Sequence, residues 1–162
     1  MNRPTLGIIG GGQLGSLLAD AAKKIGIKTV ILSDDIDAPG KSFSDKFIFG
    51  NYDDQNIINE FVNSVDLVTY EFENIPFNVL KKIDEEKTVL PKPDVNNLIQ
   101  NRLTEKDFLN KINIQTTKYK SIDKIDELKE NKNLIPGLLK TTTLGYDGKG
   151  QYKINKFEDI NN

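Results

Sequence analysis

The seven residues Gly145–Gln151 combine three glycines with a lysine, an acid and an amide, in the order Gly-Tyr-Asp-Gly-Lys-Gly-Gln. Glycine lets backbone N–H groups approach an anion closely, and a lysine adds a mobile positive charge. The segment is not a Walker A loop, because Gly145 and Gly148 are too close together and no Ser or Thr follows Lys149. Apolar residues flank it, so the tip of a flexible β-hairpin is the plain alternative. With Lys140 ending the preceding predicted strand, we favour a phosphate-binding loop.

A second glycine motif lies near the N-terminus, where Gly10, Gly12 and Gly15 fit Gly-x-Gly-x-x-Gly between a predicted strand and a predicted helix. Asp34 follows roughly 20 residues later, where a dinucleotide-binding domain keeps its ribose carboxylate. NAD binding is therefore one interpretation. The motif by itself predicts only an anion or a ribose at a helix N-terminus, and a nicotinamide enzyme has no evident use for the second glycine loop. The bland alternative is a tight turn from strand to helix.

Two carboxylates, Glu71 and Glu73, follow the predicted strand Leu67–Tyr70 in the segment Thr-Tyr-Glu-Phe-Glu-Asn-Ile-Pro. Open parallel sheets bind ligands at the carboxyl ends of their strands. A carboxylate at that edge could accept hydrogen bonds from sugar hydroxyls. The alternative is a pair of solvated loop acids, and spacing alone does not decide between them.

Composition narrows the classes of function. The chain has 162 residues and a net charge of −2 with mixed signs, so nothing indicates a nucleic-acid partner. No apolar run is long enough to span a membrane and the N-terminus lacks a signal-peptide pattern, which predicts a soluble, cytoplasmic chain. Cysteine and histidine are absent, which excludes disulfides, thiol chemistry, a Ser/His/Asp triad and His-ligated zinc within these residues. Any metal would be a hard ion held by oxygens.

Short apolar strands alternate with helical patterns over the first part of the chain, which predicts an α/β fold with a Rossmann-like parallel sheet covered on both faces. The predicted strands are Leu6–Ile9, Thr29–Leu32, Lys46–Phe49, Leu67–Tyr70 and Thr88–Leu90. The first predicted helix ends at Gly26 and carries an apolar face at helical spacing. That face consists of Leu14, Leu17, Leu18, Ala21, Ala22 and Ile25.

The character of the sequence changes after Pro93. Asp94 is expected to cap one long, polar helix, Val95–Asn110, followed by a strand at Thr116–Ser121, a helix at Asp123–Glu130 and the glycine hairpin. We therefore divide the chain into residues 1–93, a linking helix at 94–112, and an incomplete α+β unit at 113–162. The last part has few large apolar side chains for a core of its own, so we expect a fragment of a longer enzyme.

Four segments together carry a resemblance to a known family. They are GIIGGGQLG, TYEFENIP, QNRLTEKDFL and LKTTTLGYDGKGQ, and in order and spacing they resemble 5-(carboxyamino)imidazole ribonucleotide synthetase, an ATP-grasp enzyme of purine biosynthesis. Formate-dependent phosphoribosylglycinamide transferase shares the layout, but Gln13, Phe72 and Tyr146-Asp147 fit the first family better. The resemblance implies a pre-ATP-grasp domain followed by the first part of an ATP-grasp domain.

The activity implied by the resemblance is ATP-dependent carboxylation of 5-aminoimidazole ribonucleotide by bicarbonate, through carboxyphosphate. The residues implied to bind ATP are Arg102, Lys140, Gly145, Tyr146, Asp147, Gly148, Lys149, Gly150 and Gln151. Those implied to bind the ribonucleotide are Gly12, Gln13, Leu14 and Glu71. The resemblance also implies Mg²⁺ held by ligands beyond Asn162, and a homodimer for the full-length enzyme. It assigns no catalytic residue and no metal ligand to this chain.

The segment Thr141–Leu144 departs from the more basic, glycine-containing run that is usual before the ATP loop, which affects the detailed phosphate contacts. We expect this chain by itself to be inactive. Two other classes of protein stay open at this point: a nicotinamide-dependent oxidoreductase and a non-enzymatic nucleotide-binding module.

Overall fold

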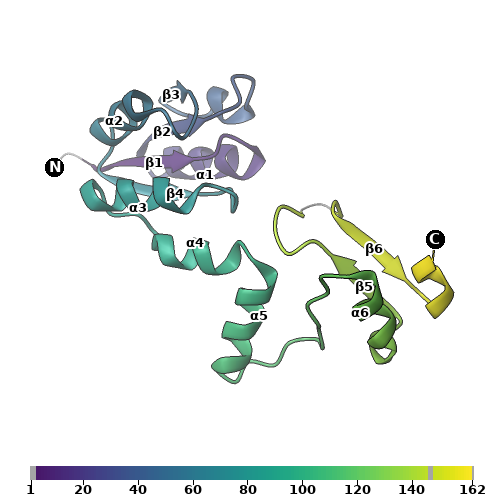
Figure 1. Ribbon diagram of the computed structural model, residues 1–162. Helices are drawn as coiled ribbons and strands as arrows, with labels where there is room; N and C mark the ends of the chain where they lie inside the picture. The colour runs from purple at the N-terminus through teal and green to yellow at the C-terminus, as the bar shows by residue number, and fades with distance from the viewer. Residues whose placement is uncertain (1–2, 146–147, 162) are drawn as a thin grey trace. The chain divides into compact units, whose positions relative to one another are not determined.

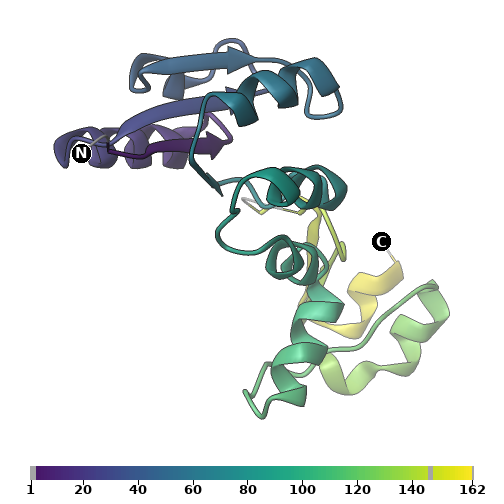
Figure 2. The same cartoon turned by 90° about the vertical axis from the view of Figure 1, so that its left-hand side faces the viewer.

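The computed structural model describes residues 3–145 and 148–161. It divides into two compact units, Met1–Asn97 and Leu98–Asn162, which are described separately. Figures 1 and 2 show the path of the chain through both units. No described helix has the length and apolar character needed to cross a membrane.

The first unit is built on a four-stranded parallel sheet in the order β3-β2-β1-β4, as Figure 1 shows. Its strands are β1 (Thr5–Ile9), β2 (Lys28–Ser33), β3 (Lys46–Phe49) and β4 (Leu67–Tyr70). Its helices are α1 (Gln13–Lys24), the 3₁₀ turn η1 (Pro39–Ser42), α2 (Gln55–Asn63), α3 (Phe77–Glu86) and α4 (Pro93–Ile99). Four of the five predicted strands and the Rossmann-like arrangement are confirmed.

Both faces of this sheet are covered, also as predicted. Ile9 and Leu32 pack on one face in a cluster that includes the fully buried Phe61 of α2. Ile8 and Ile31 point to the other face and pack against Ala19 of α1. Successive strand residues alternate between faces, so apolar runs in β1 and β2 supply two cores at once.

Helix α1 forms as predicted, but it does not turn its large apolar side chains toward the sheet. Leu14, Leu17 and Ile25 are 61%, 58% and 65% exposed. The buried positions on α1 are instead the small residues Gly15, Ser16, Ala19 and Ala22. The reason lies at the start of the helix, where a Cβ on Gly15 would lie 2.4 Å from the carbonyl oxygen of Gly10. Such a close crossing brings the small-residue face onto the sheet.

The fifth predicted strand, Thr88–Leu90, is wrong as a full strand. Val89 forms only an isolated parallel bridge with Val68. The backbone of Val68 exchanges hydrogen bonds with Thr88 and Leu90 at 3.0 and 2.9 Å. Pro91 follows at once and has no N–H to donate, so the ladder cannot extend.

The single long helix predicted at Val95–Asn110 is also wrong, because the chain forms α4 and then a separate helix α5 (Arg102–Lys111). Asn101 separates them. Its side-chain oxygen accepts hydrogen bonds from the backbone N–H groups of Leu103 and Thr104, at 2.9 and 3.4 Å. An asparagine in this position starts a new helix by satisfying its first donors.

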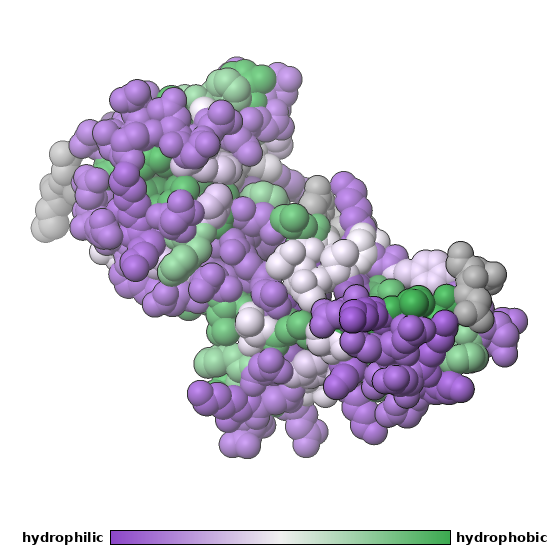
Figure 3. Space-filling model, viewed as in Figure 1, coloured by the Kyte–Doolittle hydropathy of each residue, from purple (hydrophilic) through white to green (hydrophobic). Residues whose placement is uncertain are grey.

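The second unit contains α5, α6 (Ile125–Glu130) and the antiparallel pair β5 (Gly137–Lys140) and β6 (Gln151–Ile154), with 3₁₀ turns η2 (Lys132–Leu134) and η3 (Phe157–Asn161). The predicted hairpin is confirmed. Within the described part of this unit, Ile154 and Ile160 are the only buried hydrophobic residues. Figure 3 shows hydrophobic residues, in green, among the hydrophilic residues on the surface of the molecule that faces the viewer.

The predicted strand at Thr116–Ser121 is wrong, since this segment pairs with no strand in the described structure. Its side chains bond to α5 instead. Lys106 Nζ donates to Thr117 Oγ1 at 2.8 Å, and Asn110 Nδ2 donates to Thr116 Oγ1 at 3.1 Å. These threonines therefore use their hydroxyls, rather than a backbone ladder, to fix the segment.

The crossing at Gly15 yields a stability prediction. Gly15→Ala should lower the free energy of unfolding by about 1–3 kcal/mol, because the new methyl group meets a backbone oxygen that cannot move aside alone. Leu14→Ala, one residue away on the same helix, is the matched control and should change it by about 0.5 kcal/mol or less. Urea denaturation of both variants checks this. Equal stability for Gly15→Ala and the unsubstituted chain would contradict the close crossing.

Candidate functional site

The first candidate site lies at the carboxyl edge of the sheet, where the strand order reverses. Strand β1 is followed along the chain by β2 and β3 on one side, whereas β4 lies on its other side. Ligands of open α/β sheets bind at such a switch point. Here the loop after β1 meets the residue after β4: the backbone N–H of Gly12 donates to Glu71 Oε1 at 3.1 Å.

The carboxylate of Glu71 lies directly against the backbone of the glycine loop. Gly10 has a φ of 104°, and a Cβ there would lie 2.7 Å from Glu71 Oε1. A Cβ on Gly12 would lie 3.1 Å from the same oxygen. The two sequence features that were predicted separately, the glycine motif and the acid after β4, therefore form one site.

Glu71 is half-buried, and burial raises the pKa of its carboxyl group, while the hydrogen bond from Gly12 lowers it in part. One carboxylate oxygen is fixed by the loop, and the group still has capacity to accept hydrogen bonds from a ligand hydroxyl or amine. The other two predicted substrate contacts, Gln13 and Leu14, form the first turn of α1 and are exposed.

A tyrosine at this edge was not predicted from the sequence. Tyr52 follows β3, and its hydroxyl donates to Asp34 Oδ1 at 3.3 Å. Burial raises the pKa of Tyr52 strongly, and the negative charges of Asp34 and Glu71 raise it further, so the phenol stays protonated. The acid that suggested a dinucleotide ribose therefore already accepts a hydrogen bond from the protein. The only sequence signal for the placement of Tyr52 at this edge is its position shortly after a predicted strand.

The second candidate site is the glycine loop between β5 and β6. The register places Lys140 opposite Gln151, and the backbone N–H of Thr141 donates to the carbonyl of Gly150 at 2.9 Å. Gly148 and Gly150 have φ values of 79° and 64°, in the left-handed region that favours glycine. Lys149 is exposed. The predicted contacts Tyr146 and Asp147 lie outside the described residues.

Arg102 joins this loop to the start of α5. Its guanidinium donates to the carbonyl of Thr141 at 3.0 Å and to the carbonyl of Gly145, and its backbone N–H donates to the carbonyl of Thr142 at 2.9 Å. A guanidinium has five N–H groups in a planar fork, so it can hold carbonyls and still face an anion. The family resemblance implied Arg102 as a phosphate contact but did not indicate these hydrogen bonds to the loop carbonyls.

Leu144, just before the loop, has an unusual backbone conformation. Its φ is 60°, a left-handed value that is uncommon for any residue other than glycine, asparagine or aspartate. Its side chain is 69% exposed, so burial of the side chain does little to offset the strain of this backbone conformation. The chain therefore adopts a glycine-type conformation where the family pattern expects a glycine-containing run.

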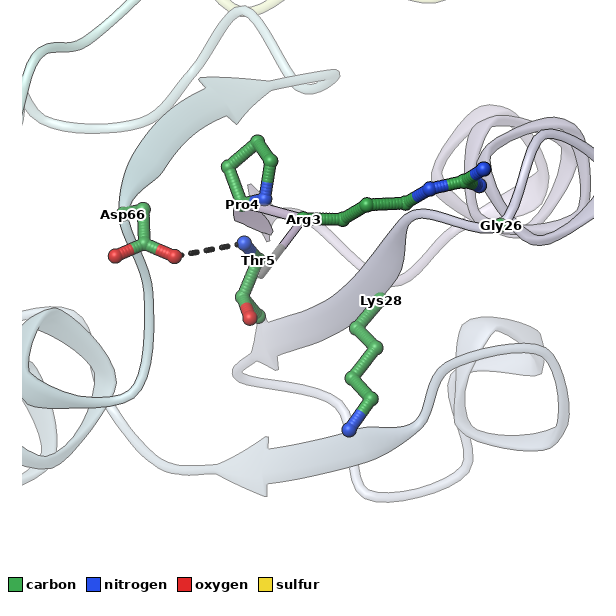
Figure 4. Close-up of a pocket in the computed structure, with 6 residues that line it drawn as sticks. All are labelled: Arg3, Pro4, Thr5, Gly26, Lys28 and Asp66. Atoms are coloured by element: carbon green, nitrogen blue, oxygen red, sulfur yellow. Dashed lines mark hydrogen bonds between the residues drawn. The ribbon is translucent and has the colours of Figure 1, made fainter. Parts of the chain in front are cut away.

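A third location, at the other edge of the sheet, has fewer features of a ligand site. A hollow at the amino edge of the sheet, about 550 Å³, is lined by Arg3, Pro4, Thr5, Gly26, Lys28 and Asp66. Figure 4 shows Asp66 accepting the backbone N–H of Thr5, at 2.8 Å, so its carboxylate serves the fold. No group of three or more acidic side chains that could hold a metal ion occurs in the described residues.

Both parts of the chain resemble domains of known protein families. The model of the ribonucleotide synthetase preATP-grasp domain matches residues 3–100, more than half of the chain. The chain belongs to this family. The model of the ATP-grasp domain matches residues 107–162. The two glycine loops and Glu71 fall within matched segments, whereas Arg102 lies between them. The fold class inferred from the sequence, a preATP-grasp sheet followed by part of an ATP-grasp domain, is confirmed.

The chain is also similar to named enzymes and solved structures. N5-carboxyaminoimidazole ribonucleotide synthases from Brucella melitensis and Staphylococcus epidermidis are each 39% identical, over 96% of this chain. The N5-carboxyaminoimidazole synthetase from Staphylococcus aureus, solved with ADP, has a TM-score of 0.90 at 36% identity and covers 98% of the chain. The Aspergillus clavatus enzyme, solved with ADP and 5-aminoimidazole ribonucleotide, has a TM-score of 0.84 at 25% identity over 99%.

This chain spans 43% and 42% of the two named synthases, and 43% of each of the two solved chains. The family resemblance inferred from four sequence segments is confirmed.

Glu71 yields a prediction for stability against pH. Because its pKa is raised in the folded state, its stabilising contribution is complete below the unfolded pKa and is lost as the pH rises through the folded pKa. Glu71→Gln should therefore be more stable than the unsubstituted chain at neutral pH, and this advantage should shrink as the pH falls through the acidic range. Urea denaturation across that range measures it, with Glu86→Gln as the control for one lost charge. An advantage independent of pH would contradict the burial of Glu71.

Leu144 yields a second prediction. Leu144→Asn should raise the free energy of unfolding by about 1 kcal/mol, because asparagine tolerates the left-handed conformation that strains leucine. Thr143→Asn tests the effect of asparagine at the neighbouring position and should give no such gain. The measurement is urea denaturation of both variants, and a loss of stability in Leu144→Asn would show that the leucine side chain contributes more than its conformation costs.

Proposed function

We propose that this chain is the substrate- and nucleotide-binding part of an ATP-dependent ligase that carboxylates 5-aminoimidazole ribonucleotide with bicarbonate. The names of the bacterial relatives support this activity, and the Aspergillus clavatus relative was solved with ADP and this ribonucleotide. The matched segments include every residue proposed here to bind a ligand except Arg102, which lies between them.

The observation that carries the proposal is the hydrogen bond from Gly12 to Glu71. In a dinucleotide site the second glycine of the motif lets the backbone approach a pyrophosphate. Here that backbone N–H faces a carboxylate, whose charge repels a pyrophosphate but accepts hydrogen bonds from hydroxyl or amine groups. The geometry therefore favours the sugar and amine of a ribonucleotide at this loop over NAD.

The second site supplies the phosphate contacts of the proposed reaction. Arg102, Lys140 and Lys149 would balance the negative charge of the phosphates, and the glycine loop would exclude water from a reactive acyl phosphate. A bicarbonate oxygen attacks the γ-phosphorus and ADP leaves. The substrate amine then bonds to the carbon of carboxyphosphate, or to CO₂ released from it, and phosphate leaves. No described residue is assigned as a general base.

Magnesium would supply positive charge to balance the phosphates in this proposal. The described residues do not fit a magnesium site, since they contain no suitable group of acids, so no step is assigned to the ion here. A homodimer of the complete enzyme and a cytoplasmic location complete the proposal and rest on the family resemblance.

Nucleotide protection tests the proposal. With magnesium present, ADP should raise the melting temperature of this chain in proportion to the logarithm of its concentration, because a ligand of the folded state stabilises it by mass action. NADH should not. Arg102→Lys should lose most of the ADP effect, since lysine cannot hold the loop carbonyls and a phosphate together. Lys111→Met, at the exposed end of the same helix, is the matched control and should keep it.

Two results would overturn this assignment. Protection by NADH without protection by ADP would indicate an oxidoreductase. Phosphate release by this chain alone, dependent on 5-aminoimidazole ribonucleotide, would show that the catalytic residues lie within it.

A further inference from the structure

The base of the glycine loop converges on Thr141, the first residue after β5. Its backbone N–H donates to the carbonyl of Gly150 at 2.9 Å, which closes the loop across its two ends. Its own carbonyl accepts from Arg102 Nη1 at 3.0 Å. The backbone of Thr141 is thus fixed both to the far end of the loop and to the start of α5.

The side chain of Thr141 lies between the two ends of the loop. A Cβ placed on Gly145 would lie 2.8 Å from Thr141 Oγ1, and a Cβ placed on Gly150 would lie 2.7 Å from the same oxygen. Both distances are shorter than the normal contact distance between a carbon and an oxygen that are not bonded to each other. One hydroxyl therefore fills the space that a side chain would need at either glycine, which gives a packing reason for glycine at both positions.

Arg102 completes the arrangement from the other side. Its Nη2 donates to the carbonyl of Gly145, and Nη1 would lie 3.4 Å from a Cβ on that glycine. Gly145 is buried, whereas the described residues 141–144 and 148–150 are exposed. Gly145, at the start of the loop, is therefore enclosed by both Thr141 and Arg102. Gly150, at its end, is hydrogen-bonded in the described structure to Thr141 and not to Arg102.

We propose that Thr141 is a positioning residue for the glycine loop: its hydroxyl sets the separation of Gly145 and Gly150, and so the direction in which Gly148 and Lys149 face a nucleotide phosphate. That the ligand is a nucleotide phosphate rests on the proposed function, whereas the positioning role of Thr141 does not depend on it.

Amide hydrogen exchange, measured by NMR on this chain without nucleotide, tests the positioning. Thr141→Ala should speed exchange of the residue-141 amide by about tenfold, because the bond to Gly150 loses the packing that supports it. Thr141→Ser keeps the hydroxyl and should stay within about twofold of the unsubstituted chain. Thr143→Ala is the matched control. Rates at Gly137 and Ile154, at the other end of the hairpin, and the melting temperature should not change in any variant.

A double-mutant cycle keeps the test decisive if one variant perturbs more than the loop. Gly145→Ala adds a methyl group that meets Thr141 Oγ1, so its effect on exchange should be smaller in the Thr141→Ala background. Part of the effect should persist, because the methyl group also lies 2.9 Å from the Lys149 carbonyl oxygen. Additive effects, or a Thr141→Ser variant as perturbed as Thr141→Ala, would overturn the proposal.

Repeating the exchange measurement with ADP and magnesium separates the two proposals. If Thr141→Ala loosens the loop and ADP slows exchange only in the unsubstituted chain and Thr141→Ser, then positioning and nucleotide binding are both supported. If the loop responds to the substitutions but ADP has no effect in any variant, Thr141 still positions the loop and the assigned nucleotide is wrong. If the substitutions have no effect, the positioning role is wrong whatever ADP does.

Discussion

The close crossing of α1 over the end of β1 is the constraint on which the first unit depends. Gly15 allows it, since any larger residue would meet the carbonyl oxygen of Gly10. The crossing brings the first turn of α1 onto the sheet and fixes the backbone of the intervening loop, which gives Gly12 the orientation to donate to Glu71. The substrate site proposed at the strand order's switch point is thus a product of helix–strand packing rather than of the loop alone.

The second unit achieves order by a different route. Its described residues bury very little apolar surface, and directional hydrogen bonds do more of the positioning. Asn101 starts α5, Lys106 and Asn110 hold the Thr116–Ser121 segment, and Arg102 holds the hairpin. A guanidinium that is rigid in shape and permanently charged suits this role, because it fixes two carbonyls without depending on a surrounding core. Each such bond is weak when water can replace it, so the unit is sensitive to the loss of any one.

The sequence predicted the elements better than their contacts. Alternating apolar runs and helical spacing gave four strands of the sheet, helix α1 and the hairpin, because these patterns are local. The contact between Gly12 and Glu71 joins residues that are distant in the chain, and only the fold shows it. The packing face of α1 was misjudged because hydrophobicity outweighed size: Leu17 is exposed, whereas Ala19 is buried.

The second half of the chain shows the same limit. A strand at Thr116–Ser121 has the right composition, but a strand also needs a partner, which no local pattern reveals. The break at Asn101 was not predicted, because the longer periodic pattern around it favoured a single helix. Arg102 was predicted as a ligand contact from the family resemblance, and its hold on the loop carbonyls became visible only with the backbone in place.

The small-residue face of α1 has a consequence for how this domain can evolve. Ala19 is fully buried against Ile8 and Ile31 of the sheet, and Ala22, on the same helix, is nearly fully buried. A larger side chain at either position would tilt or lift the whole helix, including its first turn beside Glu71. Selection for ribonucleotide binding should therefore act on side-chain volume deep in the core, while the exposed Leu17 of the same helix, which is assigned no ligand contact, is free to diverge.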